Sequence, residues 1–127
     1  LFELPHGESR QVLPDVRILY GYAGDDGKMV AAAAAAGAKG IIYAGMGNGS
    51  LPEAVEQELA RATAAGVIAV RSTRSPAGCV VTAEASYEQA GILASGSLNP
   101  AKSRILLQLA LASSSTPVAI KDLFRQA

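Results

Sequence analysis

Short apolar runs alternate along the chain with loops and with stretches of helical periodicity. The runs are rich in β-branched residues, continuous in hydrophobicity and bounded by glycine, which is typical of strands covered on both faces. They predict strands at 16–20, 40–44 and 67–70, and a weaker strand at 91–94. Helices are expected at 29–36, 52–65, 100–112 and 117–127.

Local signals support these helices. The first is dominated by alanine, the strongest helix former, and Gly37 is expected to end it as a left-handed cap. The second has apolar residues at i, i+4 and i+7 from position 55. The last two each open with a capping residue followed by proline, Asn99-Pro100 and Thr116-Pro117.

This order of elements predicts a small α/β domain of three layers, in which a short parallel sheet is covered by helices on both faces. Crossovers between its parallel strands are expected to be right-handed. Ligands of such folds bind at the loops after the carboxyl ends of the strands. Here those loops span 21–27, 45–50, 71–82 and 95–99.

Composition narrows the classes of function. Eleven Lys+Arg balance eleven Asp+Glu, so the chain lacks the positive charge of a general nucleic-acid or anionic-membrane binder. Half of the residues are hydrophobic, which argues against disorder, and no apolar run is long enough to span a membrane. Cys79 and His6 are each the single residue of their type, so we expect no internal disulfide and no metal site.

Residues 1–14 differ from the rest of the chain. They are polar, contain two prolines and do not begin with Met, as suits a linker between domains. We interpret 1–14 as an inter-domain linker and 15–127 as one domain of a longer protein. The alternative is a small complete protein with a processed tail.

A glycine loop at 45–50, GMGNGS, connects a predicted strand to a predicted helix. Its spacing is not that of a dinucleotide-binding turn, and it lacks the Gly-Lys of a phosphate-binding loop. Ser50 with Glu53 three residues later is the pattern of a helix capping box. Three glycines in one loop also let the backbone approach a small ligand closely, so both interpretations stay open.

Charged residues after the third strand are further candidates. Glu84 is either a solvated carboxylate or the partner of a ligand ammonium group. Arg71 and Arg74 are expected to form a surface pair or to reach the aspartates of the first loop. We find no motif for a nucleophile with its base, and therefore assign no catalytic residue to this chain.

The helix at 100–112 is apolar around most of its circumference, with a narrow polar stripe at Lys102, Arg104 and Gln108. A helix of this kind is buried on several sides. It is either a central core helix or an interface with another subunit or domain.

Four motifs, in order, resemble the C-terminal domain of bacterial type II L-asparaginases and glutaminase-asparaginases. They are LPDVRILYGY at 13–22, GIIYAGMGNGS at 40–50, VRSTR at 70–74 and SLNPAKSRILL at 97–107. The resemblance implies the α/β fold of that domain and hydrolysis of the side-chain amide of L-asparagine, and often of L-glutamine, to the acid plus ammonia. It implies no metal and no other cofactor.

The resemblance also implies which domain supplies the nucleophile and which supplies substrate-binding residues. The nucleophile of these enzymes is a threonine in an N-terminal domain that this chain lacks, so this part alone is expected to be inactive. The C-terminal domain places two substrate-binding residues in a neighbouring subunit's active site, and these fall on Ser50 and Glu84. Because Ser50 is Asn in some members, the amide preference stays open.

The expected partners are the substrate amino acid, the N-terminal domain and further subunits of a homotetramer, and neither nucleic acid nor membrane. Because type II members are commonly exported, the resemblance implies a periplasmic or secreted protein, and a cytoplasmic location is the alternative. The alternative function is a free-standing small α/β module that binds a ligand or regulates without catalysis.

Overall fold

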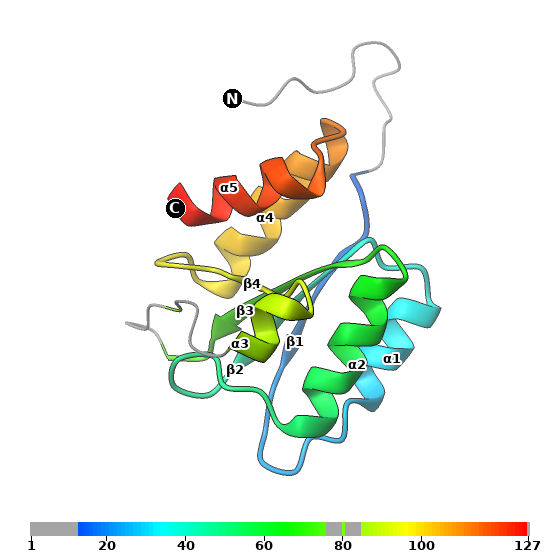
Figure 1. Cartoon of the computed structure of the whole chain (residues 1–127), viewed down its shortest axis with the longest axis vertical. Coiled ribbons are helices and arrows are strands. Elements are labelled where there is room, and N and C mark those ends of the chain that lie inside the picture. The colour runs from blue at the N-terminus through cyan, green and yellow to red at the C-terminus, as the bar shows by residue number, and fades with distance from the viewer. Residues whose placement is uncertain (1–12, 76–79, 81–84, 127) are drawn as a thin grey trace.

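A computed structural model describes residues 13–75, 80 and 85–126 of the chain. In this part the chain forms four strands and five helices (Figure 1). All strand pairs are parallel, in the order β1-β2-β3-β4. The strands are β1 (Val16–Tyr20), β2 (Gly40–Gly45), β3 (Ile68–Thr73) and β4 (Leu93–Ala94). The helices are α1 (Lys28–Ala35), α2 (Glu53–Ala64), α3 (Ala85–Gln89), α4 (Pro100–Ala112) and α5 (Pro117–Gln126).

Helices cover both faces of the sheet, which confirms the predicted three-layer α/β domain (Figure 1). Side chains alternate between the two faces along a strand, so neighbours on β2 enter different cores. Ile41 and Tyr43 pack with α1, α2 and α3, whereas Ile42 packs with α4 and α5. Every residue of β2 is buried, as expected for a central strand of a parallel sheet.

The alanine-rich helix α1 lies beside α2 on one face of the sheet (Figure 1). Val30 and Ala33 are its buried residues, and both belong to the core on that face. The helix ends as predicted, because Gly37 directly after its C-cap has a φ of 94° in the left-handed region. None of the helices in the described part of the chain is long and apolar enough to cross a bilayer.

Two of the predicted helix starts are confirmed. The Asn99 side chain accepts a hydrogen bond from Lys102 N at 2.8 Å, with Pro100 as the first helical residue. The Thr116 hydroxyl accepts one from Ala119 N at 3.2 Å at the start of α5. In both cases a side-chain oxygen pairs with a backbone N–H that has no partner within the helix.

The capping-box interpretation of Ser50 and Glu53 is wrong. Helix α2 begins at Glu53 with Pro52 at the N-cap, and no side chain caps it. Ser50 lies two residues too early, and its own N–H donates to Met46 O at 3.0 Å within the preceding loop. Ser50 is therefore not explained by the helix start.

Two further boundaries differ from the sequence expectations. Strand β3 continues beyond Val70 through Arg71, Ser72 and Thr73, all of which are buried. The helix α3 was not expected, because its five residues are too few to show an apolar periodicity. Both elements lie beside the glycine loop, and they carry residues of the candidate site.

Helix α4 is a core helix, which is one of the two interpretations that the sequence left open. Its Leu107 and Ala110 are fully buried against the sheet, so the helix is part of the core. Its other side leaves Ile105 54% exposed beside a groove of about 470 Å³. That groove is lined by Leu98, Lys102, Ile105, Leu106, Leu109, Leu123 and Gln126.

Candidate functional site

The loops after β1, β2 and β3 meet at the carboxyl end of the sheet (Figure 1). Arg74, just past β3, donates from its side chain to Gly21 O at 2.6 Å and from its backbone N to Gly45 O at 2.9 Å. The Thr73 hydroxyl donates to Gly47 O at 2.6 Å. Arg74 thus reaches the first loop as expected, but it binds a backbone carbonyl there instead of an aspartate.

The glycine loop is a tight turn, and two of its positions have room for glycine only. Gly49 N and Ser50 N both donate to Met46 O at 3.0 Å. Gly49 has a φ of 74°, and a Cβ there would lie 2.9 Å from Ser72 O. At Gly45 a Cβ would lie 2.6 Å from Ser50 O. Ser50 at the end of this turn is exposed, whereas Gly45 and Gly49 are buried.

Arg71 is 1% exposed, which contradicts the expectation of a surface arginine. Its Nη1 donates to Asn48 O at 2.9 Å and to Gly49 O at 3.2 Å, so its partners are carbonyls of the glycine loop. Its guanidinium lies 4.6 Å from the centre of the Tyr87 ring, within range of a cation–π contact. A strand residue and a loop more than twenty positions away therefore satisfy one another, which no local pattern in the sequence reveals.

Below the first loop lies a buried pair, Asp25 and Tyr43. The Tyr43 hydroxyl donates to Asp25 Oδ2 at 2.6 Å, and Gly27 N donates to Asp25 Oδ1 at 3.0 Å. Burial raises the pKa of the Tyr43 phenol, and the hydrogen bond to Asp25 raises it further. Sequence reasoning missed this pair. Its only signal was a tyrosine in an otherwise apolar strand, because a buried hydroxyl needs a polar partner.

Ser50 lines a hollow of about 210 Å³ at this end of the sheet. The first loop, the glycine loop and Tyr43 all contribute to its lining. The lining residues are Gly21, Tyr22, Ala23, Tyr43, Gly45, Met46, Ser50, Leu51 and Pro52. Most of this lining is apolar, and Ser50 adds a hydroxyl that can donate or accept a hydrogen bond with a small molecule.

The second predicted site residue, Glu84, lies outside the described residues, as do His6 and Cys79. Helix α3 begins at Ala85, the next residue in the chain. The hydroxyl of Tyr87 in this helix accepts a hydrogen bond from Leu51 N at 3.1 Å. The element that follows Glu84 is thus held directly against the residue that follows Ser50.

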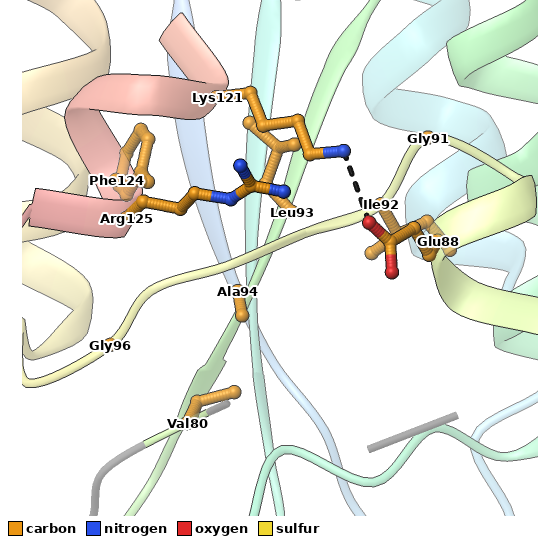
Figure 2. A pocket seen from close by; sticks show the side chains of 10 residues that line it. All are labelled: Val80, Glu88, Gly91, Ile92, Leu93, Ala94, Gly96, Lys121, Phe124 and Arg125. Atoms are coloured by element: carbon orange, nitrogen blue, oxygen red, sulfur yellow. Dashed lines mark hydrogen bonds and ion pairs between the residues drawn. The ribbon is translucent and has the colours of Figure 1, made fainter. Parts of the chain in front are cut away.

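A second hollow, of about 270 Å³, lies at the β4 edge of the sheet between α3 and α5 (Figure 2). Lys121 on α5 forms an ion pair with Glu88 on α3 at 3.1 Å, and Arg125 extends from α5 into the same space. Ser50 does not line this hollow. Within the residues that the structure describes, no three His, Cys, Asp or Glu side chains gather as a metal ion would require.

Comparison with known proteins identifies the domain. Residues 15–124 match the family model described as the Glutaminase/Asparaginase C-terminal domain. The chain belongs to this family. The match covers most of the chain and includes the glycine loop, Arg71 and the hollow beside Ser50.

Individual relatives agree with the family assignment. The chain is 48% identical to L-asparaginase 2 of Bacillus subtilis (strain 168), over 90% of its own length and 30% of the relative's. It is 44% identical to L-asparaginase 2 of Escherichia coli (strain K12), over 90% of this chain and 33% of the relative. It is 39% identical to glutaminase-asparaginase of Pseudomonas fluorescens biotype A, over 88% of this chain and 32% of the relative. The chain thus spans about a third of the length of these relatives.

Proposed function

We propose that this chain is the C-terminal domain of an asparaginase-type amidohydrolase, and that it binds the amino-acid end of the substrate. The full-length enzyme adds water to the side-chain amide of L-asparagine, or of L-glutamine, and releases the acid and ammonia. The attacking threonine belongs to an N-terminal domain outside this chain. The observation that supports the proposal most strongly is the family match, which includes the loop that exposes Ser50 beside a hollow.

The two candidate residues suit different groups of the substrate. The carboxylate of Glu84 pairs with the α-ammonium group, a charge-assisted hydrogen bond that is stronger than a neutral one. The hydroxyl of Ser50 donates to or accepts from a polar group of the same amino acid. This chain on its own is then inactive, because it binds substrate without supplying the nucleophile. The relatives give no support to a free-standing regulatory module.

The proposal includes assembly. We propose that Ser50 and Glu84 complete the active site of a neighbouring subunit in a homotetramer. The partly exposed side of α4 supports an interface, because apolar side chains such as Ile105 and Leu109 line an open groove there. Exposed apolar surface of this kind marks contact with another domain or subunit.

Glu84→Gln in the full-length enzyme tests the substrate-binding role. The amide keeps the shape of the side chain but removes the charge that faces the α-ammonium group. We expect kcat/KM for L-asparagine to fall by about ten- to a hundredfold, mostly through KM, the range for loss of a hydrogen bond to a charged group.

The matched control is Glu88→Gln, which removes a carboxylate four residues further on. Glu88 pairs with Lys121 at the other hollow, so this change should leave the kinetics as in the unmodified enzyme. Equal kinetics for Glu84→Gln and the unmodified enzyme would exclude Glu84 from the site.

A further inference from the structure

The buried arginine in β3 calls for a physical explanation. Arg71 is 1% exposed, whereas an aliphatic side chain of similar volume would avoid the cost of removing a charge from water. A buried guanidinium is tolerated only where acceptors meet its N–H groups. Two of these acceptors are Asn48 O and Gly49 O, and both belong to the glycine loop. The arginine therefore fixes the loop in addition to filling the core.

Tyr87 fixes the same loop from the other side of Ser50. It is 6% exposed, its ring stacks against the Arg71 guanidinium, and its hydroxyl accepts from Leu51 N at 3.1 Å. Arg71 thus holds the two residues before Ser50, and Tyr87 holds the residue after it. The backbone on both sides of Ser50 is fixed while the Ser50 side chain itself stays exposed.

Neither Arg71 nor Tyr87 lines the hollow beside Ser50. An effect of these two residues on a ligand there is therefore indirect, through the elements that they hold in place. Binding groups must be held within a few tenths of an ångström of their productive place, and the residues that hold them determine affinity. The contact between Arg71 and Tyr87 also joins the loop to α3, the helix that begins directly after Glu84.

We propose that Arg71 and Tyr87 are positioning residues for substrate binding. They hold the Ser50 loop in place, and thereby set the affinity for the amino-acid substrate rather than the rate of the chemical step. This inference rests on the proposed function, because it requires Ser50 to contact the substrate. It adds two residues to the site that touch neither substrate nor reacting atoms.

Tyr87→Phe in the full-length enzyme is the main test. It removes only the hydroxyl that accepts from Leu51 N and keeps the ring against Arg71. We expect KM for L-asparagine to rise by about three- to tenfold, the size of one lost neutral hydrogen bond, with kcat within about twofold. Arg71→Lys should also raise KM, because an ammonium group cannot stack on the Tyr87 ring or present N–H groups in one plane as a guanidinium does.

Thr63→Val is the matched control. The Thr63 hydroxyl lies within hydrogen-bond distance of Ala90 O at 2.7 Å and of Ala60 O within α2 at 2.8 Å, so it links the far end of the α3 segment to α2. This variant loses a comparable tertiary hydrogen bond away from the loop. We expect Thr63→Val to lower Tm without changing KM. If Tyr87→Phe has that same effect, the positioning role is overturned.

Ser50→Ala separates this inference from the proposed function. If Ser50 contacts substrate, Ser50→Ala raises KM, and adding Tyr87→Phe to it raises KM by less than about twofold further. Fully additive effects would show that Tyr87 acts elsewhere than through Ser50. If Ser50→Ala and Glu84→Gln both leave KM unchanged, the proposed function fails, and the positioning role fails with it.

Discussion

Tyr43 shows how a single residue links the core to the site. Its ring belongs to the core between the sheet and α1–α3, and its hydroxyl binds the carboxylate of Asp25. Asp25 in turn accepts from Gly27 N, so the pair fixes the loop that contributes to the lining of the hollow. Gly21, in the same loop, leaves no room for a side chain, because a Cβ there would lie 2.5 Å from the Tyr43 hydroxyl oxygen.

The raised pKa of Tyr43 predicts a dependence of stability on pH. An ordinary phenol ionises near pH 10, whereas Tyr43 in the folded protein ionises only at higher pH. Below about pH 10 both the folded and unfolded states keep the proton, and the stabilising contribution is complete. Above it the unfolded state loses the proton first, so the free energy of unfolding falls as the pH rises.

Tyr43→Phe tests this account of the pair. At neutral pH it leaves the buried Asp25 without one of its two hydrogen bonds, which we expect to cost about 1–3 kcal/mol in denaturant unfolding. Between about pH 9 and 11 the unmodified protein should lose more stability than the variant does, because the variant lacks this phenol. Parallel losses in the two proteins over that range would contradict the assigned cause.

At the scale of elements, the sequence predicted the helices, helix caps and strands whose formation depends on neighbouring residues in the chain. The alanine run, the Asn99 and Thr116 caps and the apolar strands all appear within a few residues of their expected places. The apolar pattern predicts an end of β3 at Val70, whereas the strand continues to Thr73, because the polar Arg71 and Thr73 break the pattern. Their partners lie on a loop more than twenty positions earlier, so burial becomes favourable only in the folded chain.

The site was predictable only in part for the same reason. The residue pattern left Ser50 between a helix cap and a ligand contact, and the structure rules out the cap. The substrate roles that we propose for Ser50 and Glu84 rest on the resemblance to a family. The contacts of Arg71 with Tyr87 and of Tyr43 with Asp25 became visible only in the structure, because each joins separate elements.

Gly49→Ala tests how strictly the glycine loop is built. The φ of 74° strains any other residue, and the added Cβ would also lie 2.9 Å from Ser72 O in β3. We expect a loss of stability of about 2–4 kcal/mol, from left-handed strain plus displacement of the loop, and a higher KM in the full-length enzyme.

Gly47→Ala is the control within the same loop. Gly47 also has a positive φ, 56°, but no atom lies within 4 Å of an added Cβ. It should therefore cost only the conformational strain, about 1–2 kcal/mol in thermal or denaturant unfolding. Equal losses for the two variants would show that the close contact with Ser72 does not constrain the loop.

At the scale of the whole molecule, the two faces of the sheet pack against different sets of helices. One face, with α1, α2 and α3, supports the loops around Ser50, whereas the other face packs under α4 and α5 and ends in an exposed apolar groove. The chain matches only about a third of the length of its relatives. We therefore propose that this domain binds the substrate and that another domain cleaves the bond, across a contact between subunits.

Complementation between two defective enzymes tests this shared active site most directly. One full-length variant lacks the nucleophilic threonine of the N-terminal domain, and the other carries Glu84→Gln. Each should be nearly inactive alone at low L-asparagine concentration. In co-expressed mixed oligomers, random pairing of subunits should restore about a quarter of the unmodified ammonia release, because some sites combine both intact residues. Mixed oligomers that stay as inactive as the two parents would contradict a site shared between subunits.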